Sequence, residues 1–132
     1  MLKKQIYKKA NKEWLENISK EEGVKSLPGR VYYRVLQEGN GDIHPSVNSV
    51  ITAHYTGKTI DGKVFDSSRD SIPLAIRLRD LIAGWVIAMQ QMRVGDRWEI
   101  YIPSELGYGK FSQPGIPAHS TLIFDVELLS IE

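Results

Sequence analysis

The side chains best suited to form a site in this chain are aromatic and aliphatic. They stand where predicted loops meet a predicted helix, and they are Tyr55, Phe65, Leu81, Ile82, Trp85, Tyr108, Ile116 and Phe124. Aromatic residues dominate protein cores, so each of them taken singly is more typical of a core than of a site. Tyr108 and Ile116 are the exceptions, because they lie in a loop rich in glycine and proline where we expect no core for them to join.

One carboxylate accompanies this apolar set. Asp66 follows Phe65 directly in the sequence. A single aspartate after a strand usually caps a turn. The side chain could equally reach the apolar hollow and act there as a buried acceptor. The sequence leaves both interpretations open.

Other kinds of chemistry find little support in the sequence. His44, His54 and His119 are scattered singly and not at the spacing of metal ligands, so we expect no metal site. The chain has no cysteine and no Gly-x-Ser-x-Gly nucleophile motif. Gly107-Tyr108-Gly109 lacks the spacing and the lysine of a phosphate-binding loop. We therefore predict no metal and no cofactor.

The composition is that of an ordinary globular domain. Of 132 residues, 42% are hydrophobic and 25% are charged, and the net charge of +1 argues against nucleic-acid binding as the main task. No apolar span is long enough to cross a membrane, and no apolar run of a secretory signal follows the basic N-terminus. We expect a soluble protein of the cytoplasm, or of the periplasm if a leader has been removed.

The apolar set is organised around a predicted helix from Asp80 to Met92. Leu81, Trp85 and Ala88 recur there at helical spacing, and Asp80 stands at the position of an N-cap. The flanking segments alternate apolar and polar residues with period two, which is typical of strands. We predict an α+β fold in which a strongly bent antiparallel β-sheet wraps around one short α-helix, with Trp85 at their interface.

Six segments have the alternation of strands. They are Val31–Glu38, Ser49–Thr59, Val64–Phe65, Pro73–Leu78, Arg97–Ile102 and Thr121–Ile131. Asp61-Gly62 predicts a hairpin turn before the third of them. The segment Pro103–Ser120 is rich in glycine, proline and serine and has no regular period. Long irregular loops in compact domains are usually functional, so we expect part of the site there.

Residues 2–22 form a second predicted helix. Its narrow apolar seam, at i, i+4 spacing, is made of Ile6, Ala10, Trp14 and Ile18, and Tyr7 and Leu15 widen it. We divide the chain into a helical arm with its turn, residues 1–28, and a main domain, residues 29–132. The seam either lies on its own domain or pairs with a partner helix, as in a dimer. Interleaved glutamates argue against membrane binding.

Five ordered motifs resemble those of a known family. They are Ala53-His54-Tyr55-Thr56-Gly57, Asp61-Gly62-Lys63-Val64-Phe65-Asp66-Ser67-Ser68, Leu81-Ile82-Ala83-Gly84-Trp85, Gly107-Tyr108-Gly109 and Ser120-Thr121-Leu122-Ile123-Phe124-Asp125-Val126-Glu127-Leu128. In order and spacing they are similar to the signatures of the FKBP-type peptidyl-prolyl cis-trans isomerases, over Val31 to Glu132. The arm resembles the longer, dimerising helix that precedes the domain in bacterial members similar to macrophage infectivity potentiator. A monomer and an arm-mediated homodimer both stay open.

The resemblance implies an enzyme, a peptidyl-prolyl cis-trans isomerase (EC 5.2.1.8) that acts on proline-containing polypeptides and assists protein folding. It implies a catalytic pocket with an aromatic floor, aromatic walls, an overhanging tyrosine and one acidic residue. Trp85 would be the floor, and Tyr55, Phe65 and Phe124 would be the walls. Tyr108 would overhang the pocket, and Asp66 would be the acidic residue.

The resemblance also implies a substrate-binding rim, made of Leu74, Leu81, Ile82 and Ile116. Three rim positions depart from the best-known family pattern. Leu74 stands where an aromatic residue is common, Ser71 where an arginine is found, and Gln113 where a histidine is frequent. Macrolide inhibitors of the family touch the rim, so we expect these departures to affect inhibitor binding more than activity on prolyl peptides.

Rotation about the bond before proline requires no nucleophile and no proton transfer. Twisting removes amide resonance and makes the amide less dipolar, so a dry apolar pocket favours the twisted form. We rank desolvation first among the contributions and Asp66 second. The alternative function is a module that binds prolyl or apolar segments without catalysis, as a chaperone or adaptor.

Overall fold

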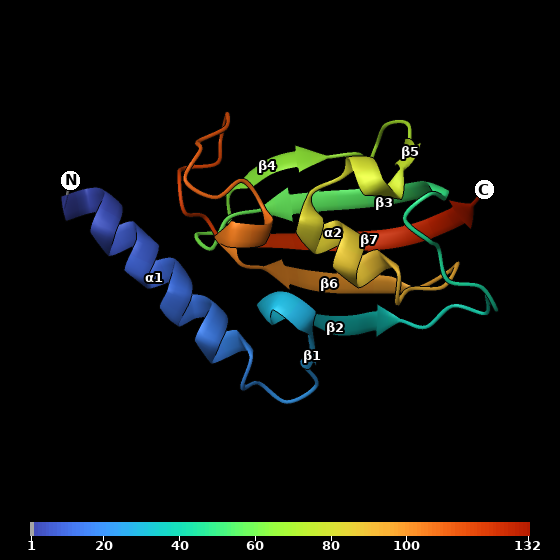
Figure 1. Cartoon of the computed structure of the whole chain (residues 1–132), viewed down its shortest axis with the longest axis horizontal. Helices are drawn as coiled ribbons and strands as arrows, with labels where there is room; N and C mark the ends of the chain where they lie inside the picture. The colour runs from blue at the N-terminus through green and yellow to red at the C-terminus, as the bar shows by residue number, and fades with distance from the viewer. Residues whose placement is uncertain (1) are drawn as a thin grey trace.

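The computed structural model describes residues 2–132, and Met1 of the predicted arm lies outside them. Its helices and strands run in the order α1 (Leu2–Ile18), β1 (Lys25–Leu27), β2 (Val31–Gln37), β3 (Val50–Lys58), β4 (Val64–Ser67), β5 (Leu74–Arg77), α2 (Ala83–Met89), β6 (Arg97–Ile102) and β7 (Leu122–Ile131). Three 3-10 turns, η1 (Pro28–Arg30), η2 (Leu78–Asp80) and η3 (Ser104–Leu106), complete it. The predicted α+β fold is confirmed (Figure 1).

The strands form one seven-stranded antiparallel sheet in the order β1-β2-β6-β7-β3-β4, with β5 also paired to β3. The outer edge of β3 is divided, since Val50–Ala53 pair with β5 and Thr56–Lys58 pair with β4. Register shifts interrupt the pairing of β3 with both β7 and β4. Irregularities of this kind bend a strand and increase its twist, which lets the sheet curve around α2.

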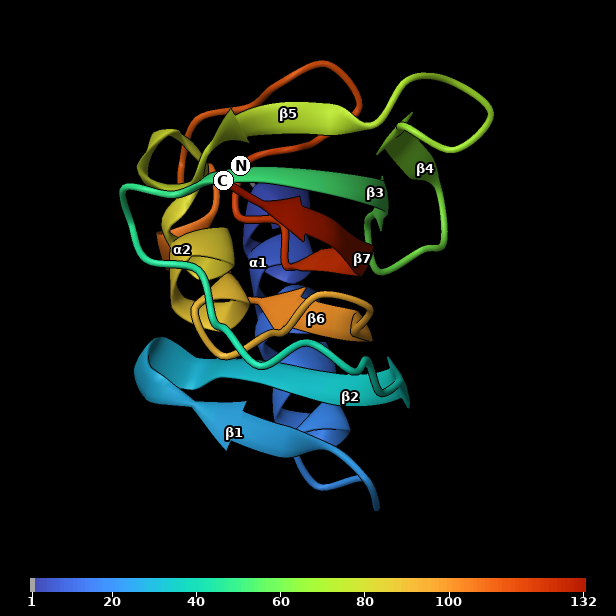
Figure 2. The same ribbon diagram turned by 90° about the vertical axis from the view of Figure 1, so that its right-hand side faces the viewer.

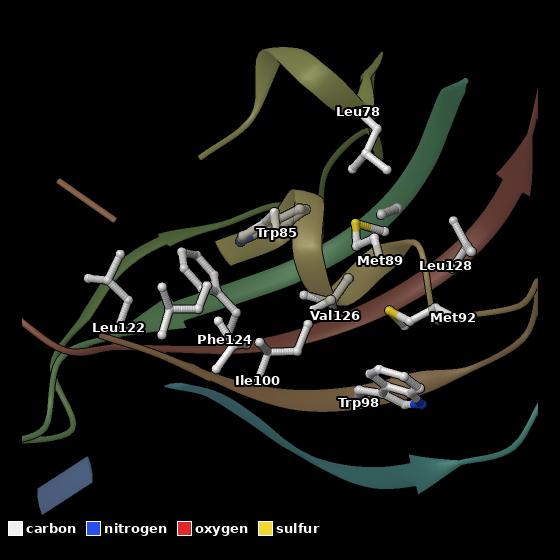
Figure 3. Packing of buried hydrophobic residues seen from close by; sticks show 14 of the residues in the cluster. Leu78, Trp85, Met89, Met92, Trp98, Ile100, Leu122, Phe124, Val126 and Leu128 are labelled. Atoms are coloured by element: carbon white, nitrogen blue, oxygen red, sulfur yellow. The ribbon is translucent and has the colours of Figure 1, made fainter. Parts of the chain in front are cut away.

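The main core lies between α2 and the sheet. Figure 2, which looks along the strands, places α2 against one face of the sheet and α1 across the far end of the strands. Trp85 and Met89 of α2 point toward Phe124 and Val126 of β7, as Figure 3 shows. Alternate residues of β7 therefore face the helix, which confirms the period-two pattern read in that strand.

The helix around Trp85 is shorter than predicted, and its cap differs. Asp80 is exposed and closes the 3-10 turn η2, while the residue before α2 is Ile82, which makes no side-chain capping bond. The prediction of Asp80 as N-cap is therefore wrong. Leu78 is fully buried in the turn, and Leu81 is extended after it, so the chain cannot become helical until Ala83.

One further boundary differs from the prediction. Lys25–Leu27, expected as part of the arm and its turn, forms β1 and pairs with β2. Three residues give too short a pattern for a strand to be recognised by alternation. In the 3-10 turn η1 that follows β1, Gly29 has a φ of +78°, a conformation that favours glycine.

The arm lies on its own domain, and its buried face overlaps the predicted seam only in part. Trp14, Leu15 and Ile18 pack in a second small core, as predicted, whereas Ala10 is exposed. Ile6 is 59% exposed, whereas Asn11 and Leu15 are buried. Trp14 contacts Tyr101 of β6 edge to face, with ring centroids 5.7 Å apart. A search for apolar residues alone misplaces this face, because one of its central positions is a polar residue, Asn11.

The docking of the arm predicts which of its residues stabilise the protein. Leu15 packs with Tyr101 and Ile123 in a small second core. Leu15→Ala removes this buried side chain, so we expect it to lower the free energy of unfolding by about 2–4 kcal/mol. Ile6→Ala, on the exposed face of the same helix, should change it by less than about 0.5 kcal/mol. Urea denaturation measures both, and equal small effects would contradict a docked arm.

Candidate active site

A pocket of about 310 Å³ opens between α2, β3, β5 and the segment after β6. Its lining residues are Tyr55, Asp66, Leu74, Asp80, Leu81, Ile82, Trp85, Tyr108 and Phe124. The pocket thus brings together eight of the residues selected from the sequence. Of the selected residues, Phe65 and Ile116 lie outside the lining.

The floor of the pocket is aromatic. Trp85 is only 3% exposed, and its ring stands nearly perpendicular to those of Tyr55 and Phe124, at centroid distances of 5.4 and 5.2 Å. Edge-to-face packing of this kind is favoured by the ring quadrupoles and fixes the orientation of each ring. The floor is therefore an apolar surface of fixed ring orientation, whose donors are the indole N–H of Trp85 and the hydroxyl of Tyr55, which is bonded to Asp66.

Phe65 extends this aromatic cluster. Its ring lies 5.6 Å from that of Phe124, again edge to face. A Cβ at Gly57 of β3 would lie 2.6 Å from both rings, so only glycine leaves room for the pair. Phe65 is half-buried and joins the aromatic cluster through Phe124, although it is not among the residues that line the pocket.

Ile116 lies in the main core, only 4% exposed. The prediction that it has no core to join is therefore wrong. Gln113 and Ile116 exchange two backbone hydrogen bonds, and Gly115 between them has a φ of +77°. This tight turn folds the loop back, so that Ile116 points inward. Tyr108, in the same long segment, remains 36% exposed and lines the pocket.

The only carboxylate selected from the sequence binds a phenol. Tyr55 Oη donates a hydrogen bond to Asp66 Oδ2 at 2.5 Å, across the paired strands β3 and β4. Asp66 is exposed, so it is an acceptor at the rim and not the buried acceptor considered from the sequence. Burial and then the hydrogen bond to Asp66 raise the pKa of Tyr55 to about 12.

The main-chain N–H of Ile82 is a second candidate donor. Ile82 O accepts hydrogen bonds from Trp85 N and Val86 N at 3.0 and 3.2 Å, which starts the helix. Among residues 2–132, no backbone hydrogen bond uses the N–H of Ile82 itself. This N–H lies at the pocket beside the floor, so it is available to a carbonyl of a bound peptide.

The rim contains one residue that sequence reasoning assigned elsewhere. Asp80 lines the pocket from the turn η2, next to Leu81 and Ile82. The sequence could have indicated Asp80 as a rim residue, because it lies directly before Leu81 and Ile82, which were selected. Of the three rim departures, Leu74 lines this pocket, Gln113 lines a separate hollow, and Ser71 belongs to neither lining.

Two other findings concern residues 2–132. No group of three or more histidine, cysteine, aspartate or glutamate side chains in this part of the chain is placed to hold a metal ion. Neither of its α-helices combines the length and the apolar character of a membrane span.

The hydrogen bond between Tyr55 and Asp66 predicts a titration. In the unfolded chain the Tyr55 phenol loses its proton near its ordinary pKa of 10.0, whereas in the folded protein it keeps it to about pH 12. The folded state then binds more protons between these values, so the contribution of Tyr55 to stability is full below pH 10 and falls as the pH rises to about 12.

NMR titration of tyrosine labelled with ¹³C at the ζ carbon measures this pKa, with Tyr55→Phe identifying the signal. We expect Asp66→Asn to lower the pKa of Tyr55 but to leave it above 10.0, because burial is the larger cause. An equal pKa of Tyr55 in the wild type and in Asp66→Asn would contradict the bond to Asp66.

Comparison with known proteins places this site in a family. A sequence model described as "FKBP-type peptidyl-prolyl cis-trans isomerase" matches residues 41–129. The isomerase FkpA of Escherichia coli strain K12 is 41% identical over 122 residues, which are 92% of this chain and 45% of FkpA. The peptidyl-prolyl cis-trans isomerase Mip of Coxiella burnetii is 42% identical over 112 residues, 83% of this chain and 48% of Mip.

The chain therefore spans about half the length of these curated relatives. Among solved structures, a peptidyl-prolyl cis-trans isomerase from Pseudomonas syringae superposes with a TM-score of 0.90 at 31% identity, over 97% of this chain and 95% of that one. The motifs, the bent sheet around α2 and these matches agree, and the chain belongs to the FKBP-type peptidyl-prolyl cis-trans isomerase family, with relatives named FkpA and Mip.

Proposed function

We propose that this chain is a peptidyl-prolyl cis-trans isomerase that accelerates rotation about X-Pro bonds in polypeptides and so assists protein folding. The observation that carries the proposal is the rigid aromatic floor, Trp85 held between Tyr55 and Phe124, open to a pocket large enough for a prolyl group. The family membership supports it as well.

The energetic demand on such a pocket is modest. The uncatalysed barrier is about 18–20 kcal/mol, and isomerisation takes tens to hundreds of seconds. Raising the rate to roughly 100 per second requires a reduction of about 5 kcal/mol, at about 1.4 kcal/mol for each factor of ten. Differential binding of the twisted amide is of this order, and no covalent intermediate is needed.

Desolvation supplies the main part of this reduction. A proline ring resting on Trp85 brings its amide between the apolar walls, where water is excluded. The planar amide has the larger dipole and loses more hydration than the twisted one, so the barrier between them falls. The walls are side chains fixed by mutual packing, so little reorganisation accompanies the reaction.

The polar groups orient the peptide. The free N–H of Ile82 donates a hydrogen bond to a substrate carbonyl, and Tyr108, which lines the same pocket, offers its hydroxyl as a further donor. Asp66 acts chiefly by holding the phenol of Tyr55, which keeps that ring edge-on to Trp85. Asp66 is in this sense secondary to the apolar floor. Leu74, Leu81 and Ile82 form the rim that contacts the residue before proline.

The second candidate function is a binding module without catalysis, a chaperone or adaptor for prolyl or apolar segments. Leu74 favours it, because an aliphatic side chain at the rim gives a wider and less defined contact than an aromatic one. The same residue leads us to propose weaker binding of macrolide inhibitors than of prolyl peptides.

We further propose that residues 29–132 are the isomerase domain and residues 1–28 its arm, acting on polypeptides and not on nucleic acid or membranes. A monomer is favoured, since the buried face of α1 lies on its own domain. Sedimentation velocity distinguishes it from an arm-mediated homodimer. For the compartment we propose the cytoplasm, or the periplasm after removal of a leader.

Isomerisation of a panel of X-Pro peptides tests the activity. We expect the wild type to accelerate it and Trp85→Leu to lower kcat/KM by about tenfold or more, because the ring that receives proline is lost. Ile6→Ala, on the exposed face of the arm, is the control and should alter kcat/KM by less than about twofold. Protein-folding assays give the second readout, since an isomerase speeds a proline-limited refolding phase and a mere binder does not.

Asp66→Ala tests the ranking of contributions. We expect kcat/KM to fall by less than about tenfold, because the carboxylate acts through Tyr55 and the apolar floor remains. Peptide affinity and thermal unfolding of the variant provide the controls. Loss of all turnover with binding and folding intact would make Asp66 a primary catalytic residue and reverse the ranking.

A further inference from the structure

A buried asparagine joins the arm to the rest of the protein. Asn11 of α1 is only 2% exposed, although its position on a helix surface would suit an apolar residue. Its polar atoms are satisfied on both sides: Nδ2 donates to Tyr7 O at 2.8 Å, and Oδ1 accepts from Thr121 N at 2.7 Å. Thr121 Oγ1 also donates to Asn11 O at 3.2 Å. Two hydrogen bonds thus join residues 110 positions apart.

A second contact lies one helical turn away. Tyr7 Oη and Ser120 Oγ are 2.8 Å apart. Ser120 Oγ donates its only hydrogen to Pro117 O at 2.6 Å, so the tyrosine hydroxyl is the donor in the first bond. Tyr7 and Asn11 therefore hold two consecutive residues, Ser120 and Thr121.

These two residues end the segment that carries Tyr108 to the pocket. The segment leaves the sheet after β6 and returns to it at β7, at the end of the strands that α1 crosses (Figure 1). Its two stems are joined by a hydrogen bond from His119 N to Gly109 O, 2.8 Å long. Gly109 is the residue next to Tyr108. Hydrogen bonds at Thr121 and at His119, joined by the backbone between them, thus connect Asn11 to the neighbour of Tyr108.

Attachment of the arm does not require this path. Leu15 and Trp14 already supply an apolar docking face against Tyr101 and Ile123. A satisfied polar network fixes one position of α1 on the domain, which apolar packing alone does not do. Any shift of the helix would leave buried polar groups without hydrogen-bond partners. The network falls where the return stem of the loop starts β7.

We propose that Asn11 and Tyr7 are positioning residues for the prolyl site: by fixing Ser120 and Thr121 they set the place of Tyr108 over the pocket. The arm then helps to position an active-site residue, in addition to burying part of the sheet. This inference rests on the isomerase activity proposed above and adds to it a role for a segment outside the residues 41–129 that the family model matches.

A double-mutant cycle tests the proposal with X-Pro peptides. We expect Asn11→Ala to lower kcat/KM by about threefold to tenfold, mainly through KM, since the floor is unchanged while Tyr108 is less well placed. In a Tyr108→Ala background the same change should cost less than about twofold, because the side chain it positions is gone. Asn17→Ala, an exposed asparagine of the same helix, is the matched control and should have no effect in either background.

The cycle separates positioning from a structural role. A loss of stability alone would lower activity equally in both backgrounds, and such additive losses would overturn the proposal. If Asn11→Ala does not fold, Tyr7→Phe takes its place in the cycle, because it removes one hydroxyl and no packing. The expected result is again a smaller effect without Tyr108.

The two proposals can fail separately. If the wild type accelerates isomerisation and the cycle is additive, only the positioning role is wrong. If the wild type does not catalyse, the isomerase proposal is wrong, and the same cycle is measured on the Kd of a fluorescent prolyl peptide. Coupling of Asn11 and Tyr108 in that Kd would support positioning, whereas no coupling or no binding would overturn it.

Discussion

The close approach of α2 to the sheet is the contact on which the pocket depends. A Cβ at Gly84 would lie 2.4 Å from Ile102 Cγ2, closer than any side chain tolerates. Glycine at this position lets the first turn of the helix rest directly on β6. The next residue, Trp85, is thereby brought down to Phe124 and becomes a floor instead of one more core side chain. If the helix lay farther from the sheet, the aromatic rings would be poorly packed and exposed to water.

The site separates apolar from polar functions by depth. Trp85 and Phe124 are buried and are held by the same packing that stabilises the domain. Asp66, Asp80 and Tyr108 lie at or near the surface, where charge and mobility cost little. Such a division suits a reaction in which the amide must be stripped of water while the flanking peptide remains solvated. The rings of Trp85 and Phe124 therefore contribute both to the stability of the domain and to its pocket. A substitution of either ring affects both.

The sequence predicts the sheet, α2 and most of the pocket for physical reasons that are local. Strand alternation is fixed by which face meets α2, and β6 was bounded correctly for that reason. The failures share another cause, since they depend on a tight turn or on a contact with a distant segment, and side-chain periodicity describes neither. Ile116 turns inward because Gln113 pairs with it across a tight turn, and α1 buries Asn11 because Thr121 offers it partners. No periodicity within either segment contains that information.

The place of β7 in the sheet has a consequence for synthesis on the ribosome. β7 lies between β6 and β3, at the middle of the strand order, yet it follows all the other strands in the chain. Until it emerges, the nascent protein holds two partial sheets, β1-β2-β6 and β3 with β4 and β5, which share no edge. Pairings so distant in sequence close slowly and leave strand edges exposed meanwhile. A protein of a family that assists folding thus completes its own fold only after translation of its central strand.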